Sequence, residues 1–335
     1  MTQRPAPAPD PLLEEVRALA ARREWPRIVE RVSPLVGEVE EPETLFHYAD
    51  ALRRVGRTPD ALCAAEGLET PVRQRGDRRL RVNLVNLIGI CLFELGRNAA
   101  AEERFGELME LAGEWGDEEF AGRACNNLGM LANVRGDPDG ALGWYGRAVA
   151  FYQRLGYTRG LAQTHHNLGI SYRDLGHEDE ADAHYLRAIE LAAAAASEDV
   201  VALAETERAV LRARAGDGEL AGTLAGRARD RYERIGDPLG RAEAVRVLAL
   251  ASRTAGRDDQ AALHLEEAFA VARDASDPLL LAEVQRDRGL LLRDRGEVAA
   301  ARDALEDAAG QFERIGAAAD AATVRSLLQE LPAGA

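Results

Sequence analysis

Apolar positions recur along the chain with the period of an α-helix. In residues 161–175 they follow the spacing i, i+4, i+7, i+11 and i+14, at Leu161, His165, Leu168, Tyr172 and Leu175. In residues 181–191 they follow a similar spacing, at Ala181, Tyr185, Ala188 and Leu191. Side chains at this spacing lie on one face of a helix. The pattern therefore predicts two amphipathic helices separated by a short turn.

This pair of helices belongs to a repeat of 40 residues. Seven glycines fall at that spacing, and an alanine follows each glycine after five residues. The glycines are Gly56, Gly96, Gly136, Gly176, Gly216, Gly256 and Gly296. The alanines are Ala61, Ala101, Ala141, Ala181, Ala221, Ala261 and Ala301. A glycine is typical of the left-handed residue that ends a helix. We interpret the alanines as positions where two helices approach closely, rather than as a binding site.

A second turn position follows each of these glycines after 20 residues. It is occupied by Gly76, Gly116, Gly156, Ala196, Gly236, Ser276 and Gly316. Each unit of 40 residues is therefore predicted to hold two helices joined by tight turns. Asp237 and Pro238, which follow Gly236, are typical of the cap and the first residue of the next helix.

The positions shared by the repeats resemble the tetratricopeptide repeat family. Its pattern has a Leu-Gly pair in the first helix, a turn glycine, an alanine five residues later, an aromatic residue and a second alanine. One unit matches at Leu128, Gly129, Gly136, Ala141, Tyr145 and Ala148. The next matches at Leu168, Gly169, Tyr172, Gly176, Ala181, Tyr185 and Ala188. Other units depart from the pattern, since Arg208 and Arg288 replace the leucine and Ala209 and Ala249 replace the glycine.

The repeat length is similar to that of the long-repeat variant in kinesin light chains, Pins/LGN spindle adaptors and Rap-type bacterial peptide receptors. The resemblance implies an all-α fold, a right-handed α-solenoid of about eight helix pairs plus a C-terminal capping helix. We expect one superhelical domain over residues 11–331. Residues 1–10, which are rich in proline, are expected to form a disordered tail, and residues 332–335 a flexible one.

Both ends of the repeat array are predicted to be irregular, as terminal repeats usually are. Residues 12–36 hold a helix pair without the turn glycine, and Gly67 and Pro71 interrupt the second helix of the next unit. Near the carboxyl end, one apolar stripe is formed by Val324, Leu327, Leu328 and Leu331, while Arg325, Gln329 and Glu330 face away. Such a helix would give the solenoid a solvated end.

Resemblance to peptide-binding tetratricopeptide repeats implies that the first helices line a concave groove. The groove positions hold Asn83, Asn86, Arg123, Asn126, Asn127, Asn133, Gln163, His166, Asn167, Arg173, Arg246, Arg253, Arg286 and Arg293. A carboxamide both donates and accepts hydrogen bonds, which suits the backbone of an extended peptide. A guanidinium group suits carboxylates. We therefore predict that the groove binds a protein or an extended peptide segment, whose acidic groups lie in the Arg-rich carboxyl-terminal half.

Three alternatives stay open for these residues. They can form a merely solvated helix face. Asn126 and Asn127 can pair with neighbouring helices. Glu243, Glu283 and Asp287 can neutralise the arginines within the chain.

Composition narrows the classes of function. The formal net charge is −15, which argues against a nucleic-acid partner, and no apolar run approaches the roughly 18 residues of a membrane span. All 42 basic residues are arginines, which is typical of a GC-rich bacterial genome. The absence of lysine excludes a Walker A or Schiff-base lysine from this chain.

Cys63, Cys91 and Cys125 form no C-x-x-C pair, and we expect all three to be core residues in a reducing cytoplasm.

The sequence carries no recognisable catalytic or cofactor motif. It has no G-x-S-x-G, no H-E-x-x-H and no Gly-rich phosphate loop after a strand. His165 is expected to pack in the core, and His177 and His184 to lie on a charged outer face rather than to bind a metal. The prediction is a non-enzymatic cytoplasmic scaffold or adaptor, without a metal or cofactor, that has neither nucleic acid nor a membrane as partner. No feature of the pattern indicates an oligomeric state.

The alternative prediction is a ligand- or signal-sensing module of a bacterial regulatory system. It resembles the helical-repeat sensor domains of MalT-like regulators and would act on a separate effector protein. A peptide needs an open channel, whereas a small ligand needs a closed pocket.

Overall fold

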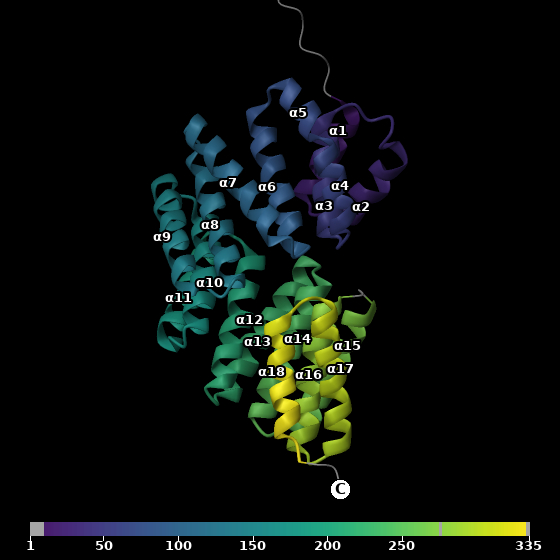
Figure 1. The fold of residues 1–335 in the computed structure, drawn as a ribbon, viewed down its shortest axis with the longest axis vertical. Helices are drawn as coiled ribbons and strands as arrows, with labels where there is room; N and C mark the ends of the chain where they lie inside the picture. Colours follow the sequence, from purple (N-terminus) through teal and green to yellow (C-terminus); the bar gives the residue numbers. More distant parts are fainter. Residues whose placement is uncertain (1–9, 275–276, 333–335) are drawn as a thin grey trace, which may run out of the picture. The chain divides into compact units, whose positions relative to one another are not determined.

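Every regular element in the described part of the chain is a helix. The computed structural model describes residues 10–274 and 277–332, and these ranges contain no strand. Consecutive helices pack against each other, for example α8 against α9 and α10 against α11, as Figure 1 shows. The predicted all-α solenoid is confirmed. The chain divides into two compact units, Met1–Leu155 and Gly156–Ala335.

The first unit contains the irregular amino-terminal helices and the first regular pairs. Its elements are α1 (Pro11–Ala21), α2 (Trp25–Val32), η1 (Ser33–Leu35), α3 (Pro42–Arg54), α4 (Thr58–Gly67), α5 (Glu69–Arg75), α6 (Arg78–Glu94), α7 (Asn98–Trp115), α8 (Glu118–Val134) and α9 (Pro138–Leu155). We call α3, α6 and α8 first helices, because each precedes a turn glycine of the 40-residue series. The helices that follow those turns are second helices.

The second unit contains regular pairs and the carboxyl-terminal helix. Its elements are α10 (Thr158–Asp174), α11 (Glu178–Ala194), α12 (Glu198–Arg214), α13 (Gly218–Ile235), α14 (Pro238–Thr254), α15 (Asp258–Asp274), α16 (Pro278–Asp294), α17 (Val298–Arg314) and α18 (Ala318–Glu330). The first helices here are α10, α12, α14 and α16, and the second helices are α11, α13, α15 and α17.

The turn glycines end helices in the left-handed conformation, as predicted. All seven glycines of the 40-residue series have positive φ, from +70° at Gly96 and Gly256 to +85° at Gly216. At the second turn position, Ala196 adopts the same conformation with φ +50°, which is costly for a residue with a Cβ. Ser276 lies outside the described residues. Asp237 caps α14, because its Oδ1 accepts a hydrogen bond from the Gly240 backbone N–H at 2.9 Å.

The alanine that follows each turn glycine lies in the core. All seven alanines of this series are at most 1% exposed. Ala181, for example, packs in one cluster with Tyr185 and Leu211, where Ile170 and Tyr172 cover it. The packing role predicted for these alanines is confirmed.

A second close contact explains the glycine of the Leu-Gly pair. A Cβ on Gly129 would lie 2.5 Å from Cε1 of Tyr145, a residue of the paired helix α9. Gly89 faces Phe105 in the same way, and Gly289 faces Leu305. A side chain at these glycines would therefore collide with the large side chain opposite. On α12 this glycine is replaced by Ala209. The residue that faces it from α13 is the small, buried Ala225.

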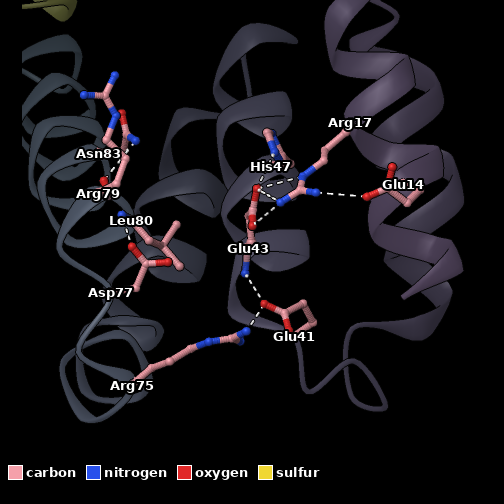
Figure 2. A network of polar contacts seen from close by, with 10 residues as sticks. All are labelled: Glu14, Arg17, Glu41, Glu43, His47, Arg75, Asp77, Arg79, Leu80 and Asn83. Carbon is pink, nitrogen blue, oxygen red and sulfur yellow. Dashed lines mark hydrogen bonds and ion pairs between the residues drawn. The ribbon is translucent and has the colours of Figure 1, made fainter. Parts of the chain in front are cut away.

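The two ends of the array differ from the regular repeats, as predicted. The helix that follows the first turn glycine is broken at Leu68 into α4 and α5. Figure 2 shows how the amino-terminal helix is tied to α3: Nη2 of Arg17 lies 2.7 Å from Oε2 of Glu43, and Nη1 contacts Glu14 on its own helix. The predicted tails lie outside the described residues, apart from Asp10, which caps α1, and Pro332.

The carboxyl-terminal helix α18 closes the second unit. Val324 and Leu331 are buried against α17 residues, and Leu327 and Leu328 cover the same cluster. Arg325, Gln329 and Glu330 are exposed. The predicted capping helix is confirmed.

Gly129→Ala should destabilise the chain, because the added methyl group would collide with the Tyr145 ring. Overpacking of this kind costs about 1–3 kcal/mol. Gly146→Ala is the matched control on α9, where a Cβ meets nothing within 4 Å. The control should gain about 0.5–1 kcal/mol from the better helix propensity of alanine. Denaturant unfolding of both variants measures the difference. Equal stabilisation by the two substitutions would show that the ring contact does not require glycine.

Candidate functional site

The residues predicted to bind a partner all lie on first helices. In the first unit, α6 carries two of them and α8 carries four: Asn83, Asn86, Arg123, Asn126, Asn127 and Asn133. In the second unit, the residues lie on α10, α14 and α16: Gln163, His166, Asn167, Arg173, Arg246, Arg253, Arg286 and Arg293. Gln163 is exposed, Arg246 is buried, and the others are half-buried.

The asparagines of the first unit make hydrogen bonds within and between helices. Asn127 Nδ2 donates to Asn86 Oδ1 at 2.9 Å, which links α8 to α6. Asn83 Nδ2 donates to the Arg79 carbonyl oxygen at 3.0 Å on its own helix (Figure 2). Asn133 Nδ2 donates to the Tyr145 hydroxyl at 3.3 Å. The alternative in which this face joins neighbouring helices is therefore observed for Asn127.

The predicted residues on α10 form a similar local network. His166 Nδ1 lies 3.1 Å from Oδ1 of Asn167, and burial lowers the pKa of His166. Arg173 forms ion pairs with Glu207 of α12 and, at 3.0 Å, with Asp174. The α10 face is thus linked to the next first helix through charged side chains.

The four arginines of α14 and α16 are all paired with carboxylates of the chain. Arg253 lies 2.6 Å from Asp294, and Arg293 lies 3.1 Å from the same carboxylate. Arg286 lies 3.0 Å from Asp287, which also holds Arg246. For the arginines, internal neutralisation, which the sequence left open, is the arrangement observed.

Arg246 is the centre of a buried charge cluster between α14 and α16. Its side chain is 8% exposed and lies 2.5 Å from Glu243 and 2.5 Å from Asp287. Oε2 of Glu283 is farther away, 3.7 Å from Arg246 Nε. Two guanidinium groups, those of Arg246 and Arg286, therefore face three carboxyl groups.

Burial and charge shift the pKa values of this cluster in different directions. Burial raises the pKa of Glu283 to about 7, although Arg246 acts against it. Burial also opposes the charged forms of Arg246 and Asp287. For these two residues the opposite charges outweigh burial, so that the pKa of Arg246 lies well above its ordinary value and the pKa of Asp287 lies below its own. Glu283 is thus the member of the cluster that changes charge near neutral pH.

An open pocket of about 430 Å³ lies beside this cluster, lined mainly by the first helices α12, α14 and α16 and also by Tyr232 of α13. Carboxyl groups of Asp199, Glu243 and Glu283 line it together with Leu203, Leu239 and Leu279. The three leucines are 37–48% exposed. The lining thus combines acidic and apolar groups, which differs from the Arg-rich groove predicted for this half of the chain.

These leucines were not among the predicted site residues, although the repeat contained a signal for them. Leu239 and Leu279 occupy the repeat position that holds Glu119, Arg159 and Asp199 in earlier units. A leucine at a position that is elsewhere charged indicates an exposed apolar surface.

The histidines predicted to be packed or solvated contact one another. His165 Nδ1 lies 2.9 Å from His184 Nδ1, and the His184 ring stacks on Tyr172 at 5.0 Å between centroids. Burial lowers the pKa of His165 to about 4, and His184 and Arg187 act in the same direction. The prediction that His184 lies on the outer face is wrong, because the side chain is half-buried against α10. Within residues 10–274 and 277–332, no group of three His, Cys, Asp or Glu side chains could hold a metal ion.

The cysteines differ from the expectation in one case. Cys91 and Cys125 are buried, and burial raises their pKa values to about 12 and about 11. Cys63 is exposed, so the prediction that all three thiols lie in the core is wrong for this residue.

No helix in the described part of the chain has the length and apolar character needed to cross a membrane.

A family model matches part of the repeat array. Residues 120–194 match the family model of the tetratricopeptide repeat. These residues run from α8 through α11, which includes the two units whose Leu-Gly, alanine and aromatic positions follow the pattern most fully. No curated protein matches the sequence.

Solved structures share the fold at low sequence identity. A Rap protein in complex with competence and sporulation factor has a TM-score of 0.63 and 17% identity, over 95% of this chain and 96% of the other. The apo form of the quorum sensor NprR from B. thuringiensis has a TM-score of 0.57 and 12% identity, over 95% and 97%. A STAND ATPase with a tetratricopeptide repeat sensor, from Pyrococcus horikoshii, has a TM-score of 0.60 and 14% identity, over 92% and 47%. At these identities the likeness is one of fold.

Glu283→Gln tests the charge state of the buried carboxyl group. Folding raises the pKa of the Glu283 carboxyl group from 4.5 to about 7. The folded protein therefore loses stability as the pH rises through that range. Glutamine stays neutral, so the Tm of the variant minus that of the wild type should increase between about pH 4.5 and about pH 7 and level off above that. Contributions from histidines cancel in this difference.

Glu266→Gln is the control, because Glu266 is exposed on α15. For this variant the Tm difference should stay constant over the same pH range. A constant difference for Glu283→Gln as well would contradict the raised pKa.

Proposed function

We propose that this tetratricopeptide-repeat chain is a non-enzymatic scaffold or adaptor that binds an extended peptide or protein segment on its first helices. The observation that carries the proposal is the row of half-buried asparagine side chains on α6 and α8 of the first unit, together with Asn167 on α10 of the second. Polar side chains held at successive repeats offer hydrogen bonds at regular intervals, which suits the backbone of an extended partner.

The internal contacts of this row support the proposal. Asn127 and Asn86 use one donor and one acceptor on each other, and this bond fixes both side chains. A carboxamide has two donors and an acceptor with two lone pairs, so each amide keeps hydrogen-bonding capacity beyond that single bond. Prearranged side chains lose less entropy when a partner binds.

Proteins of the same fold also support the proposal. The Rap protein described above was solved in complex with competence and sporulation factor, and NprR is a quorum sensor. The tetratricopeptide match at residues 120–194 includes Asn126, Asn127, Asn133 and Asn167 of α8 and α10. The proposal assigns no catalytic residue, metal or cofactor to the chain.

A signal-sensing module that acts on a separate effector protein is the second candidate. The pocket on α12, α14 and α16 favours it, because 430 Å³ lies within the range of small-ligand sites. A STAND ATPase that contains a tetratricopeptide repeat sensor shares the fold over 47% of its chain. In this function, occupancy of the first helices would change the affinity for the effector.

Substitution of one asparagine in each unit tests the proposal. Asn127→Ala combined with Asn167→Ala should remove two backbone-directed hydrogen bonds, worth together about 1–3 kcal/mol and hence about 5- to 150-fold in affinity. Because these groups are neutral, the loss should depend little on salt. The measurement is affinity capture from cell extract with mass spectrometry, followed by titration of the captured partner at two ionic strengths.

Asn98→Ala is the matched control, since Asn98 begins the second helix α7. It should retain the partner, and melting curves should show that all variants are folded. Equal capture by the double variant and the wild type would overturn the proposal.

A further inference from the structure

The pocket on α12, α14 and α16 has a charge that the chain itself leaves unbalanced. The adjoining cluster holds two guanidinium groups and three carboxyl groups. Glu243 and Asp287 occupy the close positions around Arg246, at 2.5 Å each. Glu283 is left at 3.7 Å and also lines the pocket. The position beside Glu283 therefore suits one more positive charge.

Apolar groups surround this acidic position. Leu203, Leu239 and Leu279 line the same pocket and are 45%, 37% and 48% exposed. They come from three successive first helices, so the apolar surface continues across repeats. A partner that covers it gains by removing these leucines from water.

We propose that this pocket binds an arginine or lysine side chain of a partner segment, with apolar residues of that segment covering the three leucines. The inference rests on the proposed function and specifies the chemistry of the partner segment that binds to the second unit. It assigns a cationic segment to the half of the chain where the sequence predicted an acidic one. Charge complementarity favours a cationic group over an acidic one, because the nearby arginines are already paired with carboxylates of the chain.

Other carboxylates of the pocket strengthen this preference. Asp237 and Asp277 line it while capping α14 and α16, where each accepts a backbone N–H bond at 2.9 Å. Asp199 also lines it and is held by Arg159 at 2.6 Å. An acidic partner segment would face all of these groups and would be repelled.

Binding of a cation should release the proton of Glu283. The charged groups that face this carboxyl are Glu243 and Arg246 of α14 and Arg286 and Asp287 of its own helix. Burial raises the pKa of Glu283 to about 7, and a bound guanidinium or ammonium group would lower it again. Affinity for the cationic segment should therefore increase from about pH 6 to about pH 8.

Selection from a phage-displayed library of random dodecapeptides tests the proposal and does not require the natural partner. The full-length chain is the target. Peptides that bind are then titrated against the wild type and against Glu243→Gln combined with Glu283→Gln. The control is Glu266→Gln combined with Glu306→Gln, which also replaces two carboxyl groups by amides, at exposed positions on second helices. Melting curves show that both double variants are folded.

We expect the selected peptides to contain arginine or lysine next to apolar residues. The pocket variant should bind them about tenfold more weakly or worse, as for the loss of one charge-assisted contact. The control variant should bind them as the wild type does, and replacement of the peptide arginine by citrulline should reproduce the loss.

Three results would overturn the inference. If the selected peptides are acidic or uncharged and lose affinity for the Asn127→Ala/Asn167→Ala variant, the cationic assignment fails and the proposed function stands. If no peptide binds the folded chain, the proposed function fails together with the inference. Equal weakening by the pocket variant and its matched control would also contradict the pocket site.

Discussion

The close approach of the two helices in each repeat is the constraint on which the rest of the structure depends. Alanines such as Ala181 let the second helix lie against the first, and glycines such as Gly129 leave room for the ring of Tyr145. Helices packed this closely cannot rotate without a collision. The face that each first helix presents is therefore fixed by residues on its opposite side.

This fixed orientation explains why polar groups of successive first helices meet. Asn86 bonds to Asn127, and Arg246 contacts Asp287, in both cases across 41 residues. Buried ion pairs of this kind add little net stability, because desolvation offsets the attraction. These ion pairs do determine which charged groups remain able to interact with a partner. Around Arg246 the carboxyl groups are in excess, and the adjoining pocket of the second unit is acidic.

The fold could be predicted from the sequence because its signals are local and repeated. Gly176 and Ala181 lie in one unit, and their meaning follows from spacing alone. The charge of the site could not be predicted in this way. Whether Arg246 faces a partner or Asp287 depends on the rotation of two helices whose contacting residues are 41 positions apart in the chain. The exposed leucines left a signal in the repeat, since Leu239 stands where Arg159 stands two units earlier.

A crystal structure of the full chain with a bound peptide from the display selection tests the central claim, that the first helices form the binding face. The account predicts that the peptide lies on α12, α14 and α16, with a guanidinium or ammonium group at hydrogen-bonding distance from Glu243 or Glu283. Its apolar side chains should cover Leu239 and Leu279. A peptide seated on the second helices α13, α15 and α17 would contradict the account.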